Sequence, residues 1–99
     1  MRRFRLLGAL FGAASLLLAC TRSPYTPSGT DGGSIYREAC APCHESSPGR
    51  TLRGLDLSPE TVERRISWGG RGMPAFPKIR GEARENLVRY VVVMSRPRE

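Results

Sequence analysis

The feature that most constrains this chain is the segment Cys40-Ala41-Pro42-Cys43-His44, which places two thiols and an imidazole within five residues. Side chains three positions apart lie on the same side of a helical turn, so both thiols can reach one bound group. A chain of 99 residues buries only a thin core. A group held by these side chains would therefore contribute to the core as well as to the chemistry.

The spacing C-x-x-C-H is the attachment signature of c-type haem. In such a site Cys40 and Cys43 form thioethers with the two vinyl groups along one porphyrin edge, and His44 binds the iron. Three other uses of a cysteine pair are a disulfide, a thioredoxin-like redox pair and half of a zinc site. A redox pair is typical of a βαβ context, which the flanking sequence lacks. A zinc site needs four ligands, and the chain has one histidine.

The single histidine also excludes bis-histidine ligation of the iron within this chain. The candidates for the distal position are Met73, Met94, Lys78 or no residue. Met73 lies in the glycine- and proline-rich segment 69–77, where glycines let the backbone approach a flat macrocycle and prolines stiffen the loop. We therefore predict Met73 as the distal ligand. An axial thioether raises the reduction potential relative to a second imidazole.

The pattern of apolar and capping residues predicts three helices, over residues 34–43, 59–68 and 82–95. Ser58 is a favourable N-cap ahead of a proline at the first helical position, and Gly69 ends the second helix. In the third helix Leu87, Val91 and Met94 have the spacing of a buried stripe. We expect Met94 to be a core residue.

The first residues have the organisation of a secretory signal: a basic start, then an uncharged stretch too short to span a bilayer. Leu17-Leu18-Ala19-Cys20 resembles the lipobox of bacterial lipoproteins, in which the cysteine becomes the first mature residue and is acylated. A plain signal peptide with an incidental cysteine is the alternative. We predict a lipoprotein signal peptide over residues 1–19, a lipidated N-terminus and flexible tether over 20–33, and a folded domain over 34–99.

The formal net charge of +7 gives little support to nucleic-acid binding. Removal of Arg2, Arg3 and Arg5 with the signal leaves 13 basic against 9 acidic residues, or +4. Two haem propionates would lower this by about two more. Basic residues gather around the methionine segment, where they either steer an acidic partner or form an ordinary solvated face. These residues are Arg64, Arg65, Arg71, Lys78, Arg80 and Arg84.

Three stretches resemble class I bacterial cytochrome c of the short monohaem type: GGSIYREACAPCH, LSPETVERRISWGGRGMPAFP and ENLVRYVVVM. The resemblance covers residues 32–96. It implies an all-α fold with three main helices wrapped around one covalent haem c, the first and last helices crossing near Gly32 and Tyr90. It also implies thioethers from Cys40 and Cys43 and axial ligation of the iron by His44 and Met73.

One departure from the family concerns the carbonyl that accepts the Nδ1 hydrogen of His44. Family members commonly use a proline downstream of the histidine, and here Pro48 is four residues on, so either Pro48 or another carbonyl serves. Trp68 either donates to a propionate or packs in the core. We expect three leucines to line the haem wall or the core: Leu52, Leu55 and Leu57.

The resemblance implies a one-electron carrier rather than an enzyme, with redox proteins as partners. A free carrier and a subunit of a membrane oxidase or dehydrogenase both fit the sequence. The alternative is a haem-based gas binder, sensor or weak peroxidase in which Met73 is displaced, although no second histidine could act as a distal acid–base group. The signal predicts an exported, membrane-anchored lipoprotein that faces the periplasm or the outer face of the cell membrane.

Overall fold

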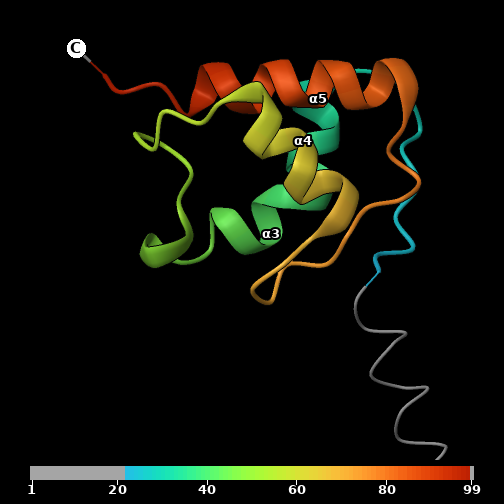
Figure 1. Ribbon diagram of the computed structural model, residues 1–99, viewed down its shortest axis with the longest axis horizontal. Helices are drawn as coiled ribbons and strands as arrows, with labels where there is room; N and C mark the ends of the chain where they lie inside the picture. The colour runs from blue at the N-terminus through green and yellow to red at the C-terminus, as the bar shows by residue number, and fades with distance from the viewer. Residues whose placement is uncertain (1–21, 99) are drawn as a thin grey trace, which may run out of the picture.

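The structure is a computed structural model, and it describes residues 22–98 (Figure 1). The predicted signal peptide and the predicted acylation site, Cys20, lie outside this range. None of the helices between residues 22 and 98 is both long and apolar enough to cross a membrane. The elements are α2 (Gly32–Ile35), a π-helical turn η1 (Tyr36–Cys40), α3 (Ala41–His44), a 3₁₀ turn η2 (Pro48–Arg50), α4 (Pro59–Trp68) and α5 (Gly81–Met94).

The first three elements form one uninterrupted helical segment that ends with the C-x-x-C-H motif. Asp31 is its N-cap, and its carboxylate accepts a hydrogen bond from the Ser34 amide at 2.9 Å. The segment begins at Gly32, two residues before the predicted start, because the capping signal is this aspartate. Its middle turn is π-helical, with the Ala41 amide donating to the carbonyl of Tyr36.

Helix α4 has the predicted bounds. The Ser58 hydroxyl accepts a hydrogen bond from the Thr61 amide at 3.2 Å, and Pro59 occupies the first helical position. Gly69 ends the helix with φ of 67°. The buried side chains of α4 are Val62 and Ile66, four residues apart on the face that packs toward the core.

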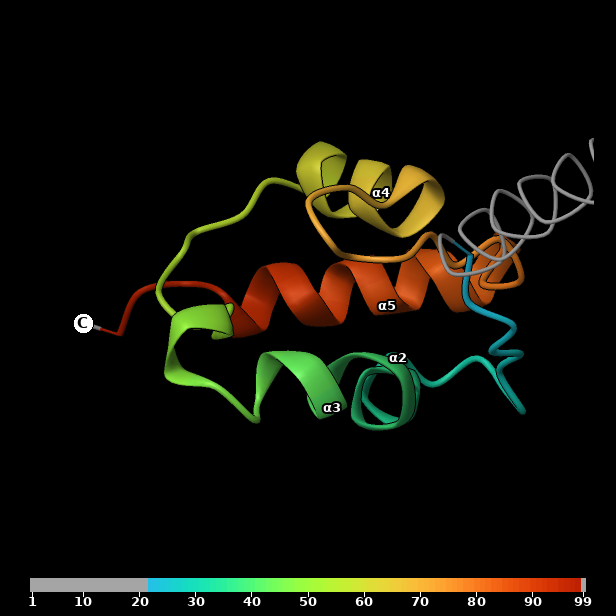
Figure 2. The same cartoon turned by 90° about the horizontal axis from the view of Figure 1, so that it is seen from below.

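Helix α5 forms the centre of the molecule, with α4 packed on one side and the helical segment α2–α3 on the other (Figure 2). Ala83, Leu87 and Val91 are its buried residues, whereas Met94 is half-buried at the edge of the core. Its C-cap, Ser95, is fully buried.

Helices α2 and α5 cross with their backbones almost in contact. A Cβ atom at Gly32 would lie 2.3 Å from the Asn86 carbonyl oxygen, so only glycine allows this approach. Beside the crossing, the rings of Tyr36 and Tyr90 pack with centroids 5.4 Å apart and an interplanar angle of 42°. The crossing and the role of Tyr90 agree with the resemblance.

Residues 22–31, named the strap here, precede α2 and run along the domain without forming a helix. The Ser23 amide donates to the Ala75 carbonyl at 2.8 Å, and the Asn86 side-chain amide donates to the Thr30 carbonyl at 2.7 Å. The Tyr25 hydroxyl donates to Glu38 at 2.6 Å. These bonds fasten a stretch that the sequence predicts as a flexible tether. Its two prolines and Gly29 oppose a helix but leave the backbone free to pair with the domain.

Candidate cofactor site

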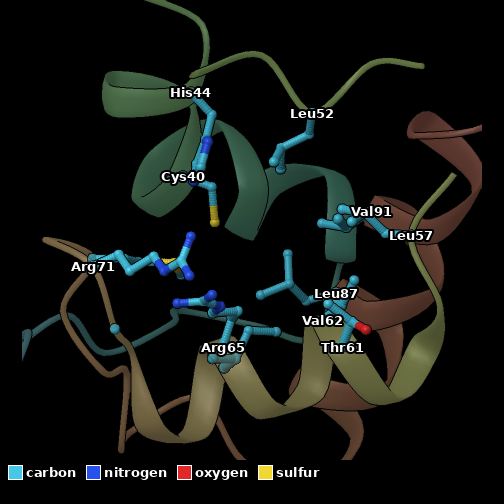
Figure 3. A pocket seen from close by; sticks show the side chains of 13 residues that line it. Cys40, His44, Leu52, Leu57, Thr61, Val62, Arg65, Arg71, Leu87 and Val91 are labelled. Atoms are coloured by element: carbon cyan, nitrogen blue, oxygen red, sulfur yellow. The ribbon is translucent and has the colours of Figure 1, made fainter. Parts of the chain in front are cut away.

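A cavity of about 330 Å³ opens between α3, α4 and α5 (Figure 3). Most of its wall is aliphatic, so it offers an apolar surface to a bound group. The aliphatic lining residues are Leu52, Leu57, Val62, Ile66, Leu87 and Val91. The prediction for two of the three leucines agrees with this lining. The prediction for Leu55 was wrong, because this side chain is 56% exposed in the loop before α4.

The predicted ligands approach the cavity from two sides. Cys40 and His44 line it from the helical segment that ends at His44, and Met73 lines it from the loop after α4. Cys43 lies on the same turn as His44; it is exposed and does not line the cavity. Of the three distal candidates, Met73 lines this cavity, and Met94 and Lys78 do not.

The orientation of His44 is fixed by a backbone carbonyl. Its Nδ1 lies 2.7 Å from the carbonyl oxygen of Arg50, the last residue of the 3₁₀ turn η2. Pro48 therefore begins the turn that presents the acceptor and is not the acceptor itself. With Nδ1 engaged, Nε2 is the nitrogen left to bind a metal.

Cys40 does not have the character of a reactive redox thiol. Both Cys40 and Cys43 are free thiols. Burial raises the pKa of the Cys40 thiol to about 11, and the neighbouring Cys43 adds to this shift. The reactive thiol of a catalytic C-x-x-C pair has a lowered pKa, because the thiolate is the nucleophile. The raised pKa makes the Cys40 thiol unsuited to that role.

Met73 sits in a tight turn that requires glycine. Gly70 and Met73 pair through backbone hydrogen bonds of 2.9 and 3.1 Å, and Gly72 has φ of 85° within the turn. Gly69 packs so closely that a Cβ atom there would lie 2.5 Å from the Met73 carbonyl oxygen. The Phe76 amide then bonds to α4. These contacts hold Met73 at the cavity wall.

Two arginines, Arg65 on α4 and Arg71 in the methionine turn, point their guanidinium groups into this cavity (Figure 3). No acidic side chain lines the cavity, and neither arginine takes part in an ion pair within residues 22–98. Arg65 is half-buried and Arg71 is exposed, so both cations stay in contact with solvent and are available to a charged group. The arrangement therefore suits a ligand that carries negative charge as well as a large apolar surface.

Sequence reasoning missed these two arginines as cavity residues and considered Trp68 instead. Trp68 is 80% exposed and does not line the cavity, so it neither packs in the core nor reaches into the site. Arg65 lies three residues after the buried Val62 and therefore shares its side of α4, whereas Trp68 lies two residues after the buried Ile66 and points away from it. The signal that could have identified Arg65 is its place next to the buried pair Val62 and Ile66 on α4.

Haem fits this set of donors. It offers a flat apolar macrocycle for the aliphatic wall, an iron for His44, vinyl groups for the two thiols, and two propionates for Arg65 and Arg71. An all-α domain with the C-x-x-C-H motif opposite a methionine turn defines a c-type cytochrome.

The family described as "Cytochrome C oxidase, cbb3-type, subunit III" has a sequence model that matches residues 27–91, and the chain belongs to this family. The matched range includes both the C-x-x-C-H motif and the methionine turn. The cofactor is thus covalently attached haem c, and the function is haem-based electron transfer. No curated protein and no solved structure matches the chain.

Proposed function

We propose that this protein is a one-electron carrier whose haem iron is bound axially by His44 and Met73. The observation that carries the proposal is that these two side chains line one cavity from separate elements, α3 and the methionine turn. The haem supplies an iron that changes oxidation state by one electron. Two protein ligands leave no coordination position for a substrate, so this arrangement favours electron transfer over catalysis at the iron.

The surrounding residues support this function through orientation and charge. The Arg50 carbonyl, 2.7 Å from Nδ1, holds the His44 imidazole in one orientation and in one tautomer. The guanidinium groups of Arg65 and Arg71 neutralise propionate charge at the cavity. The aliphatic wall excludes water. A site held in this way changes little in geometry when the iron changes charge.

The decisive experiment is the visible spectrum of the matured protein, oxidised and reduced, with and without carbon monoxide. A low-spin c-type spectrum that carbon monoxide does not change is the expected result. Met73→Ala should open the distal position and allow carbon monoxide to bind, whereas Met94→Leu should leave the spectrum as in the wild type. Prompt binding of carbon monoxide to the wild type would instead favour a gas binder, sensor or weak peroxidase.

We further propose that the protein is exported and anchored to the membrane through acylated Cys20, facing the periplasm. The signal-like residues 1–19 and the lipobox resemblance of residues 17–20 support this location. The family name supports a membrane oxidase as the redox partner. Cys20→Ser should release the protein into the soluble fraction with an unchanged spectrum. A variant that remains acylated and membrane-bound would contradict the proposed anchor.

A further inference from the structure

The strap begins beside the segment that follows the methionine turn. Arg22 forms a parallel bridge with Ala75, and the Ser23 amide donates to the Ala75 carbonyl at 2.8 Å. Ala75 is buried and lies two residues after Met73. Both views place the beginning of the described chain beside this loop (Figures 1 and 2). The chain therefore enters the domain at the side of the cavity that carries the distal methionine.

This entry point determines where a lipid on Cys20 would hold the domain, and the inference rests on that proposed acylation. Two residues span at most about 7 Å, so Cys20 cannot lie farther than this from Arg22. The strap is bound again at Tyr25 and Thr30, which opposes its release from the domain. The methionine turn would therefore stay close to the bilayer surface.

The side chains around this entry point have the chemistry of a membrane-facing surface. We name as the loop face Arg22, Arg64, Trp68 and the loop 69–75. Trp68, the only tryptophan, is 80% exposed at the end of α4. It shares a shallow groove with Arg64, Arg65 and Gly69 that has no acidic residue. A Cβ atom at Gly69 would lie 2.8 Å from the Ala75 amide, so this groove adjoins the strap.

We propose that the loop face lies on the surface of an anionic bilayer, so that the domain is held in one orientation with the methionine turn toward the head groups. Tryptophan is favoured at the membrane–water interface, and each arginine near an anionic leaflet contributes about 1 kcal/mol. The anchor holds the loop face toward the leaflet, and the attraction between charges acts there over about 8 Å, the Debye length at physiological salt. The bilayer is favoured over an acidic protein because the chain itself delivers this face to it.

The orientation can be measured by hydroxyl-radical footprinting of the acylated holoprotein on anionic vesicles, with the soluble Cys20→Ser holoprotein as the reference. Leu55 and Val93, the other large exposed apolar side chains of the described domain, are internal controls at 56% and 58% exposure. We expect oxidation of Trp68 to fall several-fold on the vesicles while oxidation of Leu55 and Val93 is unchanged. Unchanged oxidation of Trp68, or equal protection of all three, would overturn the proposal.

A second measurement uses the Cys20→Ser holoprotein alone and follows its co-sedimentation with anionic vesicles by haem absorption. Arg64→Gln should weaken partitioning about fivefold, whereas Arg96→Gln, two residues after the end of α5, should not change it. Equal effects of the two substitutions would show non-specific charge attraction. They would overturn the proposal that the loop face binds the bilayer. Protection of Trp68 by an acidic protein but not by vesicles would do the same.

The proposed lipid anchor and the proposed orientation on the bilayer can be refuted separately. If mass spectrometry of the wild-type protein found no acyl group on Cys20, the proposed anchor would be wrong. The vesicle assay would still test the loop face. An acylated protein whose Trp68 is oxidised as fast on vesicles as in solution would overturn the orientation and leave the anchor and the electron-carrier function intact.

Discussion

Gly32→Ala tests how closely the fold depends on the crossing of α2 and α5. A Cβ atom at this position would lie 2.3 Å from the carbonyl oxygen of Asn86 and 2.7 Å from its carbonyl carbon, where ordinary contacts are 3.4–4 Å. Both atoms belong to the backbone of α5, which cannot move by changing a rotamer. The two helices would have to separate by about 1 Å along their shared interface.

The expected loss of stability follows from two opposing effects. Overpacking of a tight interface costs about 1–3 kcal/mol, and a clash with backbone belongs at the upper end of this range. Alanine recovers about 0.5–1 kcal/mol of backbone entropy relative to glycine in a helix. The free energy of unfolding of the holoprotein should therefore fall by about 2 kcal/mol, which lowers the melting temperature by about 10 °C in a domain of this size.

The assay is guanidinium unfolding of the holoprotein, followed by far-UV circular dichroism. Gly33→Ala is the matched control: its Cβ atom would meet the Tyr90 ring at 3.2 Å and an arginine side chain at 3.3 Å, and both can shift. Gly29→Ala meets nothing within 4 Å, and both controls should stay within about 0.5 kcal/mol of the wild type. If Gly32→Ala were as stable as these controls, the close crossing would be wrong.

Three further predictions concern charge, the strap and pH. Arg65→Gln should lower the reduction potential of the haem, because a positive charge near the iron disfavours the oxidised state. An unchanged or higher potential in spectroelectrochemistry would show that the Arg65 guanidinium does not point into the cavity. Tyr25→Phe, which loses the strap's hydrogen bond of 2.6 Å, should speed carbon monoxide binding by weakening Met73; wild-type rates would mean that the strap does not support the turn. Hydrogen bonds from Ser34 lower the pKa of Asp31 in the folded state, so this stabilising effect is present at neutral pH and is lost as the pH falls below about 4. Asp31→Asn should flatten the acid side of the stability–pH curve, and identical curves would argue against the cap.

The parts of the fold that the sequence predicted well have local causes. The bounds of α4 follow from Ser58, the proline after it and Gly69, which act within one turn of the chain. The buried stripe of α5 follows from the spacing of Leu87 and Val91. The motif and the methionine turn could be assigned to one cofactor because each has its own chemical signature.

The parts that were missed depend on contacts between distant segments. The strap has the composition of a linker, and its pairing with Ala75 exists only because the methionine loop presents a free carbonyl there. The acceptor for His44 is at Arg50 because η2 turns the chain back toward α3. The exposure of Leu55 depends on the path of the loop before α4, and periodicity carries no information about a loop.

The π-helical turn at Tyr36–Cys40 changes the direction in which side chains point between the two ends of the first helical segment. In a regular α-helix each residue advances the side-chain direction by about 100°, so the face that meets α5 would dictate the face that carries the cysteines and His44. The wider turn absorbs one residue between these two faces. Deleting one residue among 37–39 would keep every motif yet rotate the attachment turn away from the cavity, which should be seen as retained helix content without covalent haem. One inserted residue thus lets the helix crossing and the cofactor attachment vary separately.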